Sequence, residues 1–277
     1  MSVPPKIGKY AAAARLFACP ICRAELVPRE LSLVCEAGHC FDISRRGYVN
    51  FAPAAHAGGD VYDASLFEAR RLAARLGAFD ALADVTAKLL AAKTHGGYVL
   101  DAGCGDGALT KAIARELPSS AFVGADIVRD AIRLAASGPD DGALWCAADI
   151  TRLPFAGGAF GAVLNILCAA NYAEFARVLA PSGLIVKVLP GPLHYIEIYR
   201  QNGMDKPPDT QVREQFFARV RDGGELRATA RFGPAHPPEL LRALIESSPL
   251  CRAPGIAASA EEGLTLDWTI LWGYMRQ

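Results

Sequence analysis

The sequence predicts an α/β protein whose doubly wound, mainly parallel sheet of seven strands follows a small metal-binding module and a helical linker. Two observations predict this fold. From residue 97 onward, apolar runs of strand length alternate with helical patterns, and such alternation gives parallel sheets that are covered on both faces. Before it, four cysteines and a histidine gather within residues 19–40, a spacing typical of a metal-binding module.

The composition is that of an ordinary globular protein. The chain has 277 residues, of which 52% are hydrophobic and 21% are charged, and its formal net charge is zero. This balance gives no support to nucleic-acid binding over the whole surface, and it leaves a local basic patch open. No apolar run approaches the ~20 residues that span a bilayer, and no signal peptide is evident. We therefore expect a cytoplasmic protein without a membrane partner; the sequence leaves its oligomeric state open.

The chain divides into four expected parts. Residues 1–18 form a leader, and residues 19–52 form the metal module. Residues 53–95 form a linker and helical segment, in which the small-residue stretch 53–60 precedes a region rich in Ala, Leu and Arg. The apolar spacing in that region predicts one or two amphipathic helices, separated at Gly77. Residues 96–277 form the large α/β domain.

Zinc is the metal that the N-terminal module predicts. Cys19 and Cys22 form a C-x-x-C pair, and Cys35 and His39 follow at a distance that allows the four side chains to close a tetrahedron around Zn²⁺. Cys40 is the rival to His39 as the fourth ligand. A redox disulfide between Cys19 and Cys22 is the alternative to a metal site, although no thioredoxin-like βαβ unit surrounds the pair.

The remaining elements follow from apolar periodicity. Strands are expected at residues 31–34, 97–102, 121–127, 143–148, 160–167, 184–189, 226–232 and 264–272. Helices are expected near residues 107–117, 129–137, 171–180 and 238–247. In a sheet of this kind, ligands bind at the carboxyl ends of the strands, near the topological switch point.

The turn after the strand 97–102 carries the clearest binding signal. Asp101 ends the strand, and Gly103, Gly105 and Gly107 follow at alternate positions directly before a helix. Glycine allows positive φ and a close approach of a ligand to the backbone. The spacing D-x-G-x-G-x-G differs from the dinucleotide-binding pattern G-x-G-x-x-G. It resembles motif I of the class I S-adenosylmethionine (SAM) methyltransferases, where the glycines pack on the methionine part of SAM and the acid faces its ammonium group.

Two further acids end the next two strands. Asp126, followed by Ile127, stands where a carboxylate can accept hydrogen bonds from ribose hydroxyls. Asp149, followed by Ile150, stands where a carboxylate and backbone can read an adenine edge. The residues expected to bind SAM are Asp101, Gly103, Gly105, Asp126, Ile127, Asp149, Ile150 and Asn165.

A wider resemblance covers about residues 19–200. The metal cluster and the following stretch FDISRRGYVN (41–50) look like the N-terminal module of the RlmA/TlrB family of large-subunit rRNA guanine-N1 methyltransferases. The other matching segments are residues 59–60, 68–70, 152–155, 174–179, 190–192 and 194–197. The resemblance implies a class I SAM-methyltransferase fold, a zinc module that helps to grip an RNA hairpin, and methylation of a guanine at N1.

The chain departs from this family at the edge that follows the strand 160–167. The family's Asn is present as Asn165, but Ala169 and Ala170 occupy the positions of a proline and a basic residue. In the linker, the family's Gly-His-Tyr is replaced by Gly-Ala-Phe at 77–79. A smaller and neutral edge favours a small molecule over a nucleobase with its phosphates.

Three functions therefore compete. In the first, the scaffold is repurposed, and Asn165, Asn171 and Tyr172 are the catalytic residues that orient a reacting amine or a small acceptor. The reaction would be methyl transfer to that acceptor, or ring closure of SAM to azetidine-2-carboxylate with release of methylthioadenosine, similar to the azetidine-2-carboxylate synthases. In the second, the protein is a 23S rRNA guanine-N1 methyltransferase with an rRNA hairpin as partner. In the third, it binds zinc and SAM or RNA without catalysis.

Two of the candidate residues also have ordinary explanations. Asn171 is a good N-cap for the helix that follows it. His194 is a candidate general base or a solvated side chain.

Overall fold

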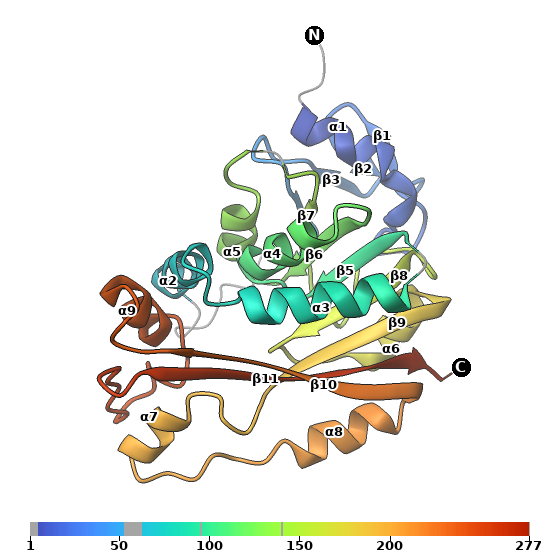
Figure 1. Ribbon diagram of the computed structural model, residues 1–277. Helices are drawn as coiled ribbons and strands as arrows, with labels where there is room; N and C mark the ends of the chain where they lie inside the picture. The colour runs from blue at the N-terminus through green and yellow to red at the C-terminus, as the bar shows by residue number, and fades with distance from the viewer. Residues whose placement is uncertain (1–4, 53–62, 95, 140, 277) are drawn as a thin grey trace.

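The computed structural model describes residues 5–52, 63–94, 96–139 and 141–276 (Figure 1). The strands of the main sheet are β4 (Val49–Asn50), β5 (Tyr98–Ala102), β6 (Ala121–Asp126), β7 (Leu144–Ala147), β8 (Phe160–Ile166), β9 (Leu179–Pro190), β10 (Val220–Phe232) and β11 (Leu264–Met275). They lie in the order β10-β11-β9-β8-β5-β6-β7-β4. The expected doubly wound α/β fold is confirmed.

The sheet is parallel except at one strand. β11 runs antiparallel to both β9 and β10, whereas the remaining neighbours pair in parallel. β5 pairs with β6 on one side and with β8 on the other, so the strand order reverses there, and a ligand site is expected at this switch point. The eighth strand, β4, was not predicted because two residues are too short to show a period.

Helices cover both faces of the sheet. They are α2 (Ala64–Arg75), α3 (Asp80–Lys93), α4 (Ala108–Glu116), α5 (Arg129–Ala135), α6 (Tyr172–Val178), α7 (Ile196–Gln201), α8 (Thr210–Phe217) and α9 (Pro238–Glu246). Val99 and Leu100, neighbours in β5, belong to the two different cores, as the alternation of a strand requires. The first core holds apolar residues of α3, α4, α5 and α9, and the second holds those of α6 and α8.

The N-terminal residues are part of the second core. They form α1 (Pro5–Ala12), a 3₁₀ turn at Ala14–Leu16, and a small antiparallel sheet of β1 (Val27–Arg29), β2 (Ser32–Val34) and β3 (Cys40–Asp42). Tyr10, Phe17 and Leu33 are buried in the same cluster as Leu100 and Val123 of the main sheet. The expected leader and metal module therefore pack directly on the α/β domain.

Most expected elements are present. The helices expected near 107–117, 129–137, 171–180 and 238–247 correspond to α4, α5, α6 and α9, and the short strand 31–34 corresponds to β2. Gly77, with φ +83°, separates α2 from α3. The small-residue stretch 53–60, with its matching pair 59–60, lies outside the described residues. Among the helices in the described ranges, none combines the length and the apolar character needed to cross a membrane.

Candidate functional site

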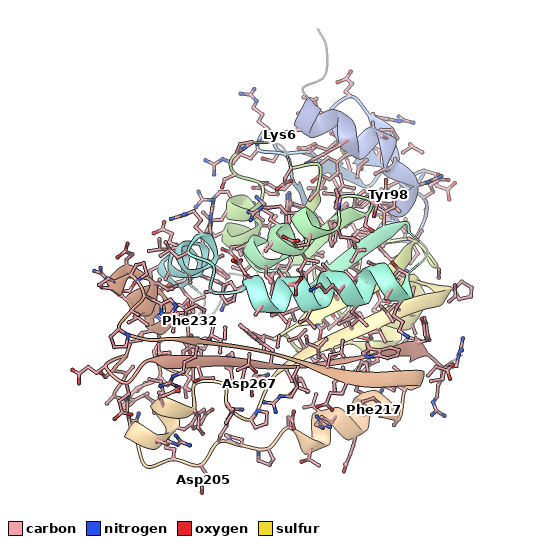
Figure 2. The ribbon with its side chains drawn as sticks, in the orientation of Figure 1. Lys6, Tyr98, Asp205, Phe217, Phe232 and Asp267 are labelled. Atoms are coloured by element: carbon pink, nitrogen blue, oxygen red, sulfur yellow. The ribbon has the colours of Figure 1, made fainter. Side chains whose placement is uncertain are left out.

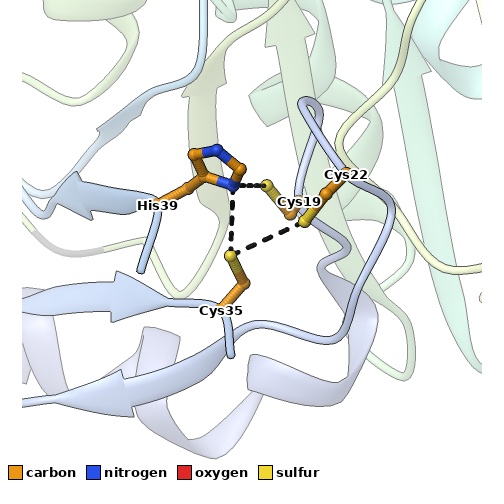
Figure 3. A group of neighbouring side chains, drawn as sticks. All are labelled: Cys19, Cys22, Cys35 and His39. Atoms are coloured by element: carbon orange, nitrogen blue, oxygen red, sulfur yellow. Dashed lines mark hydrogen bonds between the residues drawn. The ribbon is translucent and has the colours of Figure 1, made fainter. Parts of the chain in front are cut away.

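Four side chains of the N-terminal module converge on one point (Figure 3). Cys19 and Cys22 come from the turn that follows the 3₁₀ turn, and Cys35 and His39 flank the turn between β2 and β3. One ligand atom from each lies within 4.8 Å of the other three. The four residues predicted to bind a metal are therefore brought together.

The distances in this cluster fit Zn²⁺. A tetrahedral ion with Zn–S bonds of ~2.3 Å separates its sulfur ligands by about 3.8 Å. The Sγ atoms of Cys22 and Cys35 lie 3.7 Å apart, and His39 Nδ1 lies 3.5 Å from Cys19 Sγ and 3.3 Å from Cys35 Sγ. A set of three thiolates and one imidazole is typical of structural zinc. Cys40 lies outside the group, with its Sγ 4.0 Å from Asp42 Oδ1.

A cavity of about 720 Å³ opens at the carboxyl ends of β5, β6 and β8. One end is built by the turn after β5 and by the first residues after β6. The lining residues of this end include Asp101, Gly103, Gly105, Asp126 and Ile127. Five of the eight residues expected to bind SAM thus share one wall of one cavity.

Asp101, near the end of β5, is a buried carboxylate that lines this cavity. Its side chain is 2% exposed, and Oδ2 accepts a hydrogen bond of 2.5 Å from the Thr110 hydroxyl. Oδ1 has no hydrogen-bond partner among the described residues. Burial, reinforced by the nearby charge of Asp126, raises the pKa of Asp101 to about 7. A cation bound in the cavity would therefore stabilise the ionised form.

Asp126 fastens the glycine-rich turn to the end of β6. Its Oδ2 accepts the N–H of Gly105 at 2.8 Å, and its Oδ1 accepts the N–H of Val128 at 2.9 Å. Gly103 has φ +89°, and a Cβ there would lie 2.3 Å from Cys168 Sγ. The turn therefore requires glycine at this position, where Cys168 packs against its backbone.

The other end of the cavity is aromatic. The lining residues of this end include Phe79, His194, Tyr195, Tyr199 and Trp268. The ring centroids of His194 and Trp268 lie 5.8 Å apart, and those of Phe79 and Trp268 lie 6.4 Å apart, both in edge-on arrangements. Trp268 Nε1 is buried without a hydrogen-bond partner among the described residues. This end is therefore rich in aromatic rings, of which Trp268 is fully buried.

Two cations line the cavity. Arg70 of α2 lies beside the glycine-rich turn, and its guanidinium sits 5.9 Å from the ring centroid of Phe67. Lys206 borders the aromatic end, and burial lowers its pKa. The cavity thus has a cation near each end.

Three expected SAM ligands do not line this cavity. Asp149 Oδ1 accepts hydrogen bonds from the N–H and the hydroxyl of Thr151, at 2.8 and 2.7 Å, and Ile150 packs on the second core. Asn165 is fully buried beneath the cavity, where its Nδ2 donates to the carbonyls of Ala102 and Ala169 at 2.8 and 2.9 Å. Asn165 therefore ties the end of β5 to the loop after β8.

Lys187 completes the support under that loop. Its Nζ donates to Asn165 Oδ1 at 2.5 Å and also to the carbonyl of Cys168. Burial lowers the pKa of this lysine to about 8. The buried ammonium fixes the loop whose next residue, Ala169, lines the cavity.

The other two residues expected to be catalytic, Asn171 and Tyr172, also lie off the cavity wall. Asn171 Oδ1 accepts the N–H of Glu174 at 3.1 Å, which makes Asn171 the N-cap of α6. The ring of Tyr172 packs edge-on against Phe175 and Phe216, with centroids 6.2 and 6.4 Å away. Asn171 therefore caps a helix and the Tyr172 ring packs among aromatic side chains, whereas the Tyr172 hydroxyl is buried without a hydrogen-bond partner among the described residues.

Sequence reasoning missed most of the aromatic end. Phe79 and Trp268 are 189 positions apart, and no local motif marks Trp268. Arg70 and His194 belong to segments 68–70 and 194–197, which match the family. This match was the sequence signal that could have indicated these two residues as part of the site. Two positions at which the chain departs from the family pattern, Phe79 and Ala169, both line the cavity.

Known protein families match both the N-terminal module and the α/β domain. Residues 17–58 match a family model described as "RlmA, N-terminal", and residues 99–183 match one described as "Methyltransferase domain". A solved structure of the YcgJ protein from Bacillus subtilis is 16% identical, with a TM-score of 0.45, and the match covers 70% of this chain and 98% of that one.

Curated relatives cover most of the chain. It is 36% identical over 225 residues to the Bacillus subtilis protein named "Putative 23S rRNA (guanine-N(1)-)-methyltransferase YxjB", with 76% of this chain and 79% of that protein covered. It is 29% identical to the Streptomyces fradiae "23S rRNA (guanine(748)-N(1))-methyltransferase", with 79% and 75% covered. The chain therefore belongs to the RlmA-like family of SAM-dependent methyltransferases, and it carries that family's N-terminal zinc ribbon.

Proposed function

We propose that this enzyme methylates N1 of a guanine in 23S rRNA. The observation that carries the proposal is a single cavity that joins the turn at Gly103 to an aromatic end at Trp268, in a chain whose curated relatives are named for that reaction. One cavity that reaches both groups allows a methyl donor and a flat acceptor to meet without intervening water.

The donor end has the groups that SAM requires. Asp101, Gly103, Gly105 and Asp126 line this end of the cavity. We propose that Asp101 and the glycine turn face the methionine part of SAM and that Asp126 faces its ribose. Arg70, beside the glycine-rich turn, is placed to pair with the carboxylate of SAM. SAM supplies an electrophilic methyl group when it is bound. Asp149 and Ile150 remain predictions for the adenine edge, and Asn165 remains a prediction as a SAM-binding residue.

The acceptor end suits an extruded base. Phe79 and Tyr199 are half-buried and offer aromatic surfaces, and the buried rings of Tyr195 and Trp268 line the same end of the cavity. Enzymes that modify bases stack the extruded base against aromatic surfaces. Leu167, which is 46% exposed and also lines the cavity, adds an apolar group at the rim. The zinc ribbon, which packs on the α/β domain, is proposed to contact the RNA hairpin. An rRNA substrate agrees with the expected cytoplasmic location.

The placement of Asn165, Asn171 and Tyr172 does not favour the small-molecule reactions expected from the sequence. Each of these side chains is engaged off the cavity wall, so none lies where it could orient an amine of SAM. Ring closure to azetidine-2-carboxylate and methyl transfer to a small acceptor therefore become outcomes of the test rather than proposals.

The test is methylation of a 23S rRNA transcript by the purified, zinc-loaded enzyme with SAM. The product is digested to nucleosides and analysed by mass spectrometry. We expect 1-methylguanosine with the wild type. Asp126→Ala should show a loss of SAM affinity of roughly 5- to 150-fold, which corresponds to ~1–3 kcal/mol. Asp130→Ala, an exposed acid in α5, is the matched control and should behave as wild type.

A parallel incubation with SAM alone separates the alternatives. Methylthioadenosine in that incubation, together with unmodified rRNA, would overturn the proposal and restore ring closure. An unmodified transcript without any product from SAM alone would also overturn the assignment of rRNA as substrate.

A further inference from the structure

We propose that His194 is the general base of this enzyme, and that its Nε2 takes the proton from N1 of the guanine as the methyl group is transferred. The inference rests on the proposed function and adds the residue that makes the acceptor nitrogen nucleophilic. His194 lines the aromatic end of the cavity, in contact with Tyr195 and Trp268.

The loop that carries His194 is held in place by hydrogen bonds to one residue of β11, Asp267. The backbone carbonyl of Asp267 accepts the N–H of Gly191 at 2.8 Å, and its Oδ2 accepts the N–H of Leu193 at 2.8 Å. A Cβ at Gly191 would lie 2.5 Å from the same Oδ2, so the loop can approach this closely because that position is glycine. His194 therefore follows a segment of fixed geometry.

Asp267 lies in β11 (Figure 2), and its carboxylate is held by two side chains. Its side chain is fully buried, Oδ2 accepts a hydrogen bond of 2.6 Å from Arg227 Nη2, and Oδ1 accepts one of 2.7 Å from the Thr229 hydroxyl. The two partners come from the neighbouring strand β10. The carboxylate, its arginine and the loop above it form one hydrogen-bonded unit.

The imidazole of His194 is anchored through one nitrogen. Nδ1 lies 2.8 Å from the backbone carbonyl oxygen of Asp267 and 3.1 Å from its backbone nitrogen. We assign the proton to Nδ1 because the carbonyl oxygen is the nearer partner. Anchoring of this kind fixes the tautomer and leaves the Nε2 lone pair available. No hydrogen bond from Nε2 is found among the described residues.

The surroundings keep this imidazole neutral. Burial lowers the pKa of His194 to about 4, and the cation Lys206 acts in the same direction, whereas the Asp267 contacts oppose it. At neutral pH the ring is therefore in the form that accepts a proton.

The acids in the cavity are less suited to this task. Of the four described acids that line the cavity, Asp209 lies close to the charge of Lys206, and the other three lie at the donor end. There Asp101 is bonded to Thr110, and both oxygens of Asp126 accept backbone N–H groups. Asp106, on the same turn, lies close to the charge of Arg70. His194 is the titratable side chain that combines a place among the aromatic rings with a free lone pair.

The proposed step balances in atoms and charge. The N1–H bond of guanine breaks, and its proton moves to Nε2 of His194. The nitrogen forms a bond to the methyl carbon, and the electron pair of the carbon–sulfur bond passes to sulfur, which gives S-adenosylhomocysteine. The imidazolium then returns its proton to solvent.

The test is single-turnover methylation of the 23S rRNA transcript by His194→Gln, His194→Asn and His194→Ala, with the wild type beside them. General-base catalysis contributes ~10²–10⁴-fold, so each variant should lose turnover by that factor. Their SAM affinities, measured by calorimetry, should stay within about twofold, which also shows that they fold. His236→Ala, an exposed histidine, is the matched control.

Rescue separates a base from a structural residue. Free imidazole should enter the space left in His194→Ala and restore turnover in proportion to its concentration, and it should have no effect on the wild type. Full turnover in both amide variants would overturn the proposal, as would a slow His194→Ala enzyme that imidazole leaves slow. A wild type that leaves the transcript unmodified would instead refute the proposed function, and this inference with it.

Discussion

The hydroxyl of Tyr10 accepts the backbone N–H of Trp145 at 2.8 Å and lies 2.8 and 3.0 Å from the carbonyl oxygens of Trp145 and Gly47. Tyr10 belongs to α1, Gly47 to the zinc ribbon and Trp145 to β7 of the main sheet. One fully buried side chain thus joins three segments of the chain. The N-terminal region is therefore expected to contribute to the stability of the methyltransferase domain.

Tyr10→Phe tests this connection. The substitution removes the acceptor of the Trp145 N–H, and a buried donor left without a partner costs ~1–3 kcal/mol. We expect the free energy of unfolding, measured by urea titration, to fall by that amount with an unchanged slope. Tyr98→Phe is the control, because the Tyr98 hydroxyl makes no hydrogen bond within the described part of the chain. Equal stabilities for the two variants would contradict the expected role of Tyr10.

Loss of the metal should weaken the whole molecule. Cys19 and Cys35 belong to the same buried cluster as Leu100 of β5, so the zinc ribbon and the sheet share a core. Structural zinc contributes several kcal/mol to folding, and its removal by a chelator should lower the melting temperature by roughly 10 °C in a single transition. Cys22→Ser should reproduce this effect, whereas Cys40→Ser should keep one zinc per chain.

Elemental analysis together with calorimetric melting measures both effects. A Cys40→Ser protein without zinc would show that Cys40 is the fourth ligand. Two separate transitions after chelation would show that the ribbon melts independently of the sheet.

SAM binding should release a proton near pH 7. The pKa of Asp101 is raised to about 7 by burial, so about half of the unliganded molecules carry a protonated Asp101 at that pH. The ammonium group of SAM favours the carboxylate, so the affinity should rise from pH 5.5 to 7, by at most tenfold per pH unit. Calorimetry in two buffers of different ionisation enthalpy measures the released proton.

Asp101→Asn is the control for this linkage. It keeps the shape of the side chain and the contact with Thr110 but has no proton to lose, so its SAM affinity should be weaker and level with pH. A wild type that binds SAM without proton release at pH 7 would contradict the assignment of Asp101 to the ammonium group.

The parts of the site that could be predicted from the sequence are local. Asp101 and the glycines after it lie within one turn, and Cys19 to His39 within a module of about twenty residues, so spacing alone indicates the chemistry. The other seven strands of the main sheet could be predicted because each shows an apolar pattern of strand length in the sequence. The short strand β4 and the helix α1 were missed because each is defined by packing on the distant strand β7.

The acceptor end could not be predicted because its residues come from distant segments. Phe79 precedes α3, whereas Trp268 lies in β11, the last strand of the described chain. Asp149 is expected to face SAM because it ends a parallel strand, and Asn165 because the family carries an asparagine at that position. The position of a residue at a strand end does not fix the direction of its side chain, and the described contacts of both point elsewhere.

Asn171 gives the sharpest test between the sequence-based expectation and the structure. Its Oδ1 accepts the N–H of Glu174 at 3.1 Å, and Asn171 begins α6 as its N-cap. Replacing such a cap by alanine costs ~0.5–2 kcal/mol. We therefore expect Asn171→Ala to lower the free energy of unfolding by that amount, and to leave SAM affinity and turnover within about twofold of wild type at temperatures where the protein stays folded.

Asn171→Asp and Asn171→Ser separate the cap from catalysis. Both keep an oxygen that can accept the Glu174 N–H, so both should restore most of the stability that Asn171→Ala loses. Neither keeps the amide group that would orient a reacting amine. If turnover fell by a hundredfold or more in Asn171→Asp and Asn171→Ser while their unfolding curves matched wild type, the amide would act in catalysis, and α6 capping would not explain the residue. If Asn171→Asp and Asn171→Ser instead kept both the stability and the turnover of wild type, Asn171 would have a structural role only.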